Sequence, residues 1–116
     1  MATYTVELVK PAERVYLEIQ SAGSAQAATL RIADDYLKGL ESEPFDSGVA
    51  LPAPFEEILW GIRDPLRFYY TIFNDPLIVR VLEILRMRDG EQRRQFNQLM
   101  APGQSPKYAA WLRAPH

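Results

Sequence analysis

Cysteine is absent from the 116-residue sequence, and the single histidine, His116, is the last residue. Without cysteine the chain has no disulfide, no thiolate nucleophile and no cysteine-ligated zinc site, a composition that suits a reducing compartment. A lone histidine at the end of the chain also excludes a ribonuclease mechanism that uses two histidines. We therefore expect neither a metal nor another cofactor.

Long apolar segments are also missing. The most apolar stretch, residues 77–85, is far shorter than the roughly 20 residues that a membrane helix needs. The first residues do not form the charged and then apolar pattern of a signal segment. With 47% apolar and 24% charged side chains, the chain has the composition of one globular domain. We expect a soluble protein that stays in the cytoplasm and has no membrane partner.

Basic residues are scarce in the first half of the chain and frequent in the second. Residues 1–59 carry four basic and ten acidic groups, a net charge of −6, whereas residues 60–116 carry nine basic and five acidic groups, a net charge of +4. Eight of the nine are arginine, which binds phosphate and carboxylate through two parallel hydrogen bonds. The second half therefore suits an anionic partner, although a solvated face explains the same charges equally well.

The first third of the chain has the pattern of a strand followed by two helices. Apolar and polar residues alternate over residues 3–9, which predicts a half-buried strand. Pro11 suits the first turn of a helix, and Gly23 is placed to end it. A second helix is expected from a cap at Ser24 to about Glu41. The two helices should form a hairpin.

A proline-rich segment, residues 42–54, is expected to be a surface loop between the helices and a sheet. Three strands are predicted after it, at residues 58–63, 66–73 and 77–86, with a turn at 74–76 joining the last two. The third strand is almost continuously apolar, so it should lie in the middle of the sheet and be covered on both faces. A short helix is expected at residues 91–100.

The side chains of the strand at residues 66–73 divide into two faces. The expected core face consists of Leu66, Phe68, Tyr70 and Ile72. The expected exposed face consists of Arg67, Tyr69, Thr71 and Phe73. The chain thus has the element order of an α+β fold in which one face of the sheet packs on the helices.

Together, this order and two segments, LRFYY at residues 66–70 and IVRVLEILRMRD at residues 78–89, resemble the RelE/ParE superfamily of toxins. The likeness covers roughly residues 3–96. It implies a toxin domain at residues 1–100, with an N-terminal strand, a helical hairpin, an antiparallel three-stranded meander packed on the helices and a short C-terminal helix. Residues 101–116 would be a C-terminal extension of this domain.

The resemblance implies the toxin of a type II toxin–antitoxin system, held inactive by a cognate antitoxin. RelE-like members cut messenger RNA on the ribosome, whereas ParE-like members poison DNA gyrase without nuclease activity. A relic that only binds the antitoxin or dimerises is a third alternative, and both a homodimer and a heterotetramer with the antitoxin fit the family. We favour the mRNA-cleaving endoribonuclease.

RNA cleavage of this kind needs groups that stabilise a phosphorane and groups that move protons. Arg67 matches the arginine of the family's middle strand, and Arg86 or Arg88 matches the basic residues at the end of the last strand. At the position of the family's C-terminal tyrosine the chain has Phe96, which cannot transfer a proton. Tyr69 lies on the same predicted face as Arg67 and is the candidate replacement. The expected catalytic residues are therefore Arg67, Arg88 and Tyr69.

Four further residues are candidates for RNA binding: Arg86, Arg93, Arg94 and Phe96. The arginines would contact phosphate, and Phe96 would stack on a base. Ion pairing of the arginines with Glu83 or Asp89, and core packing of Phe96, are the structural alternatives. For the antitoxin, the expected docking areas are the acidic helical half and the loop that carries Phe45 and Phe55.

Overall fold

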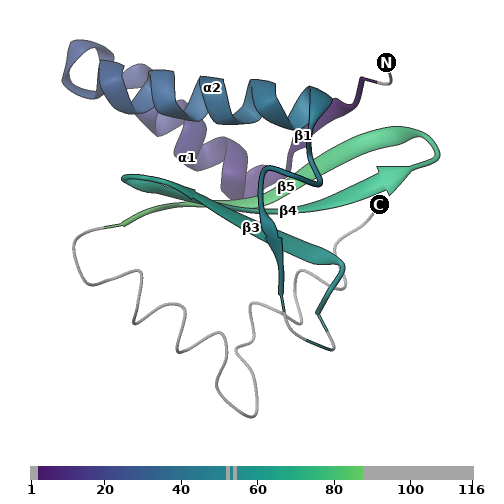
Figure 1. Cartoon of the computed structure of the whole chain (residues 1–116). Helices are drawn as coiled ribbons and strands as arrows, with labels where there is room; N and C mark the ends of the chain where they lie inside the picture. Colours follow the sequence, from purple (N-terminus) through teal and green to yellow (C-terminus); the bar gives the residue numbers. More distant parts are fainter. Residues whose placement is uncertain (1–2, 52, 54, 88–116) are drawn as a thin grey trace. The chain divides into compact units, whose positions relative to one another are not determined.

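The computed structural model describes residues 3–51, 53 and 55–87. Contacts divide the chain into two compact units, residues 1–86 and residues 87–116, and the fold described below is that of the first unit (Figure 1). The expected helix at residues 91–100 lies outside the described residues. The same is true of four candidate site residues, Arg88, Arg93, Arg94 and Phe96.

Two helices and a five-stranded sheet form the described unit. In chain order the elements are β1 (Thr5–Leu8), α1 (Lys10–Ser21), the 3-10 turn η1 (Gly23–Gln26), α2 (Ala27–Ser42), β2 (Val49–Ala50), β3 (Ile58–Arg63), β4 (Leu66–Asn74) and β5 (Leu77–Arg86). The strand order in the sheet is β1-β5-β4-β3-β2. β1 runs parallel to β5, and the other neighbours are antiparallel. Both helices cover the same face of the sheet (Figure 1), which confirms the predicted α+β fold.

The connection between the helices differs from the prediction. α1 carries its proline in the first turn, as expected. Gly23 then adopts a positive φ of 63°, a conformation that glycine reaches without steric cost. This reversal leads directly into the 3-10 turn, so α2 begins at Ala27 rather than after a cap at Ser24, and no side chain caps it.

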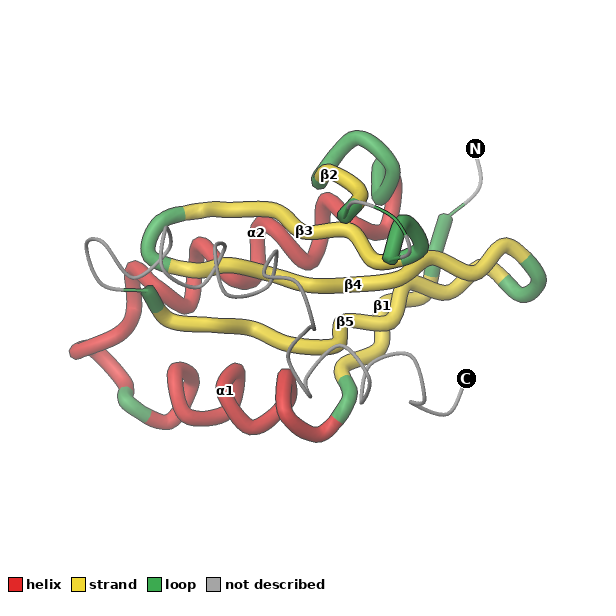
Figure 2. The backbone as a smooth tube through the Cα atoms, turned by 90° about the horizontal axis from the view of Figure 1, so that it is seen from below, coloured by secondary structure: helices red, strands yellow, loops and turns green. Residues whose placement is uncertain are grey.

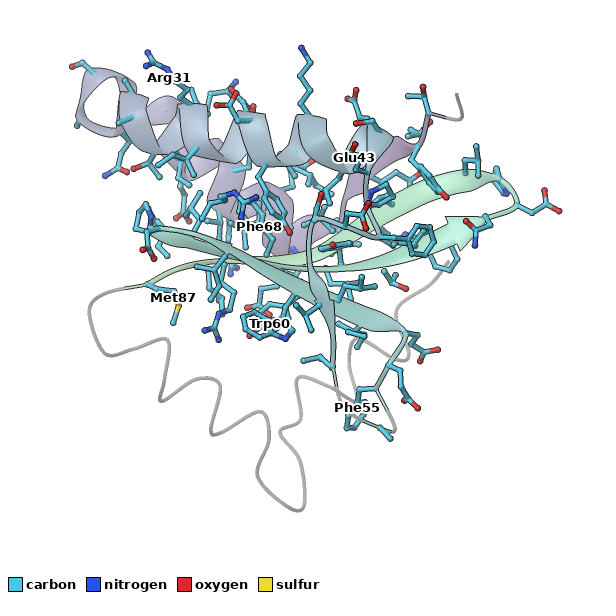
Figure 3. The ribbon with its side chains drawn as sticks, in the orientation of Figure 1. Arg31, Glu43, Phe55, Trp60, Phe68 and Met87 are labelled. Carbon is cyan, nitrogen blue, oxygen red and sulfur yellow. The ribbon has the colours of Figure 1, made fainter. Side chains whose placement is uncertain are left out.

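The core lies between the helices and the sheet. Leu66, Phe68 and Tyr70 of β4 are fully buried, which confirms the predicted core face of this strand. The ring of Phe68 stacks on that of Tyr36 from α2, with centroids 4.1 Å apart, and Figure 3 shows Phe68 directed toward the helices. Removing a buried ring of this size from a core costs about 3–5 kcal/mol.

β5 lies between β1 and β4, as predicted for a central strand. Val79, Val81 and Ile84 are fully buried in the core beneath the helices. On the other face Arg80 and Glu83 are only partly buried. Leu82, which is not part of that core, is also buried, so the predicted cover of β5 is incomplete only at partly buried positions such as Arg80 and Glu83.

The segment predicted as a loop contains a short strand, β2, which pairs with β3 at Leu59 and Trp60. Two core phenols hold this segment in place: Tyr36 Oη donates to the Ser47 carbonyl at 2.8 Å, and Tyr70 Oη donates to the Pro44 carbonyl at 2.8 Å. Gly48 permits the close approach, since a Cβ there would lie 2.7 Å from the Trp60 carbonyl oxygen. Tertiary hydrogen bonds, rather than local propensity, thus create β2.

Candidate functional site on the far face of the sheet

The sheet has a second face, directed away from α1 and α2, which we call the far face. Figure 2 views the molecule from this side, with β3, β4 and β5 adjacent. Strand register places Trp60 of β3 and Glu83 of β5 on either side of Tyr69 in β4. Because directly paired residues point to the same face, these three side chains and Arg67, two residues before Tyr69, form one group. We call it the far-face cluster.

Arg67 is the centre of contacts in the far-face cluster. Its Nη1 donates a hydrogen bond to Tyr69 Oη at 3.2 Å. Its guanidinium carbon lies 5.1 Å from the centroid of the Trp60 ring, within range of a cation–π interaction. Figure 3 shows Trp60 directed away from the helices. The arrangement fixes the guanidinium against the sheet and leaves little freedom to its side chain.

The prediction that Arg67 and Tyr69 are exposed is wrong. Arg67 is 2% exposed and Tyr69 is 1% exposed. Alternation along a strand reports which face a side chain occupies, but it does not report how well that face is covered. The two residues do share a face, as predicted, and they are in direct contact.

Burial raises the pKa of the Tyr69 phenol above its ordinary value, while the hydrogen bond and charge of Arg67 lower it and the charge of Glu83 raises it further. The net direction is upward, so Tyr69 keeps its proton at neutral pH. It can therefore donate a proton or a hydrogen bond, but it cannot act as a base. If the phenol loses its proton, the adjacent guanidinium stabilises the negative charge.

A second arginine lies farther along the far face. Arg80 of β5 pairs with Glu7 of β1 at 3.3 Å, and its guanidinium carbon lies 5.3 Å from the centroid of the Phe73 ring. Neither Arg80 nor Glu7 was predicted as a site residue. Their positions follow from the parallel pairing of β1 with β5, which aligns the two residues directly.

Arg86 does not join the far-face cluster. Its Nη2 lies 2.6 Å from a carboxylate oxygen of Glu18 in α1, and both side chains are about half exposed, at 47% and 48%. The side chain thus reaches the helix layer, whereas Arg67 lies on the opposite face. Arg86 thus forms an ion pair with Glu18, a partner that was not predicted, and its role in RNA binding stays a prediction.

Residues 3–51, 53 and 55–87 hold no group of three or more histidine, cysteine, aspartate or glutamate side chains that could bind a metal. No helix in the same part of the chain is long and apolar enough to cross a membrane.

No protein-family model and no curated protein matches this sequence. Solved structures do match. The toxin–antitoxin complex RelBE2 from Mycobacterium tuberculosis contains a chain with 22% identity and a TM-score of 0.63, over 77% of this chain and 97% of that one. The archaeal RelE–RelB complex from Pyrococcus horikoshii gives 16% identity and a TM-score of 0.54, over 76% of this chain and 99% of that one.

A chromosomal ParDE toxin–antitoxin system from P. aeruginosa is similar as well, with 11% identity and a TM-score of 0.56 over 74% of this chain and 98% of that one. At these identities the similarity is one of fold. Because both RelE and ParE structures match, the fold alone does not select one activity.

Proposed function

We propose that this chain, whose fold is that of the RelE/ParE toxins, is the toxin of a type II toxin–antitoxin pair and cleaves messenger RNA on the ribosome in the cytoplasm. The observation that carries the proposal is the contact between Arg67 and Tyr69 on the far face. It joins a group that stabilises phosphate charge to one that carries a proton. Arg67 also matches the arginine of the family's middle strand.

In this reaction the ribose 2′-oxygen attacks the adjacent phosphorus and the 5′-oxygen leaves. The Arg67 guanidinium would neutralise the negative charge that develops on the phosphorane oxygens, a role that suits its fixed position against Trp60. Tyr69 would protonate the leaving 5′-oxygen, since its raised pKa keeps the phenol protonated. Arg67 would then stabilise the resulting phenolate.

The burial of Arg67 and Tyr69 places a condition on this function. At exposures of 2% and 1%, neither side chain is accessible to an RNA strand in the described conformation. The far-face cluster must become accessible when the protein binds the ribosome. Activity should therefore depend on the ribosome and be absent with free RNA.

Growth arrest provides the test of this proposal. Expression of the chain without its antitoxin should arrest growth, and Arg67→Ala should relieve the arrest, because a phosphorane-stabilising group of this kind contributes about 100-fold or more to the rate. The matched control is Arg80→Ala, which removes another far-face arginine that also stacks on an aromatic ring. It should leave the arrest intact. Thermal unfolding of both variants separates loss of function from loss of fold.

A second candidate function, poisoning of DNA gyrase, is favoured by the same burial. A protein that acts by binding alone needs no accessible catalytic groups, so buried Arg67 and Tyr69 would be structural residues. In that case Arg67→Ala would still arrest growth, and supercoiling would be blocked while translation continued. Harmless expression of the wild-type chain would instead support a relic that only binds an antitoxin.

For the antitoxin, the loop is the stronger of the two predicted docking areas, and its exposed part is the segment that follows α2. Phe45 is 57% exposed and Val49 is 63% exposed, and the acidic residues Glu43 and Asp46 are exposed beside them in sequence. This combination suits an amphipathic partner segment with basic residues. Phe55, predicted as part of the same area, is only 7% exposed and does not contribute.

A further inference from the structure

An irregularity in β5 determines where Glu83 points. From the turn onward, Leu77 to Val81 pair with Asn74 to Tyr70 in regular order. If this register continued, Glu83 would lie opposite Phe68, in the core. Instead the register shifts between Tyr69 and Tyr70, and Glu83 pairs with Tyr69. The shift leaves Leu82 without a partner residue in β4.

This shift is a β-bulge. It places the Glu83 carboxylate on the far face, and the next residue, Ile84, faces the core again. Ile84 pairs with Phe68, and both are fully buried. Bulges that redirect a side chain are common beside active sites. Here the redirected side chain is the one that lies next to the Arg67–Tyr69 pair. The charge of Glu83 contributes to the raised pKa of Tyr69, which agrees with their proximity.

We propose that Glu83 is the general base of the far-face cluster and takes the proton from the ribose 2′-hydroxyl. The inference rests on the proposed mRNA cleavage and adds the group that this reaction otherwise lacks. Tyr69 cannot serve as the base because it holds its proton. Glu7, the other carboxylate on the far face of the described strands, lies on β1 opposite Arg80, whereas Glu83 lies directly opposite Tyr69.

The resulting reaction is balanced without a co-reactant. The 2′-oxygen forms a bond to phosphorus as its proton moves to the Glu83 carboxylate, and the bond from phosphorus to the 5′-oxygen breaks as Tyr69 donates its proton to that oxygen. The products are a 2′,3′-cyclic phosphate and a 5′-hydroxyl. Transfer of the proton from Glu83 to the Tyr69 phenolate, directly or through water, restores both groups.

Glu83→Gln tests this role because glutamine keeps the shape of the side chain but cannot accept the proton. On mRNA bound to ribosomes, the single-turnover cleavage rate of Glu83→Gln should fall by about 100-fold or more. Glu83→Asp, which keeps a carboxylate, should cleave faster than Glu83→Gln, an effect that a purely structural role would not produce.

Glu7→Gln is the matched control, since it neutralises the other far-face carboxylate on a neighbouring strand. It should retain the wild-type rate, and both variants should unfold at a temperature close to that of the wild type. A Glu83→Gln protein that cleaves at the wild-type rate would overturn the role of Glu83 alone. A wild-type protein that cleaves no ribosome-bound mRNA would overturn the proposed function together with this inference.

Discussion

The guanidinium of Arg67 contacts the indole ring of Trp60 and the phenol of Tyr69. These contacts restrict the chemistry that the guanidinium and the phenol can perform. The positive charge is held in place by Trp60 and by the hydrogen bond to Tyr69. Interactions of this kind are stronger in a buried site than in water. Arg67 and Tyr69 are therefore suited to stabilising charge at one fixed position. The pKa of Tyr69 should report directly on the charged groups beside it.

The two charged neighbours of Tyr69 should shift its titration in opposite directions. Arg67→Ala should raise the pKa of Tyr69, because it removes the hydrogen bond and the positive charge that lower it, whereas Glu83→Gln should lower this pKa by removing a negative charge. Phenolate absorbance can be followed with increasing pH, with Tyr69→Phe in each background to isolate the signal of this residue. Shifts of the same sign in both variants would contradict the described geometry.

The sequence pattern predicted part of the far-face cluster. Alternation in β4 correctly assigned Arg67 and Tyr69 to one face, but it could not report their burial, which depends on neighbouring strands. Glu83 was considered only as an ion-pair partner. A signal for its position was nevertheless present: Val79 and Val81 alternate inward, so the next inward position would be a glutamate. A carboxylate at a core position of a strand indicates a bulge.

Among the elements, the long strands were predicted more accurately than the connections. The bounds of β3 and β5 agree with the predicted ranges, because strong apolar patterns and clear turn residues delimit both. β2 and the 3-10 turn were missed. β2 depends on hydrogen bonds from Tyr36 and Tyr70, which are distant in sequence from Val49–Ala50, so no local pattern could indicate it.

The hydrogen bond from Tyr70 to the Pro44 carbonyl should stabilise the segment before β2. Tyr70→Phe should lower the free energy of unfolding by about 1–3 kcal/mol, because it leaves a buried carbonyl without its donor. Denaturant unfolding at neutral pH measures this loss. The matched control is Tyr4→Phe, which removes an exposed hydrogen bond to Asn74 and should change stability by about 0.5 kcal/mol or less. Equal effects of the two substitutions would contradict this role.

Burial of Tyr36 and Tyr70 should also make the fold sensitive to alkaline pH. Burial is the main cause that raises the pKa of each phenol above the ordinary value of 10.0. The unfolded chain releases these protons near pH 10, whereas the folded chain retains them to higher pH. The stability that they contribute is therefore fully present below about pH 10 and decreases above it. A free energy of unfolding that stays constant from pH 9 to pH 11 would contradict this expectation.

Considered as a whole, the described unit combines an acidic helical half with a far face that carries arginine and aromatic side chains. The order of its elements was predictable because each has its own hydrophobic period. The choice between RNA cleavage and gyrase binding could not be predicted, since structures named for RelE and for ParE share this fold.

The most direct test of the central proposal exposes the purified wild-type chain, free of any partner, to three substrates in parallel. These are a defined messenger RNA alone, the same messenger RNA on programmed ribosomes, and relaxed plasmid with DNA gyrase. We expect cleavage only of the ribosome-bound RNA, because Arg67 and Tyr69 are buried in the free protein, and we expect normal supercoiling. Intact ribosome-bound RNA together with blocked supercoiling would contradict the proposal.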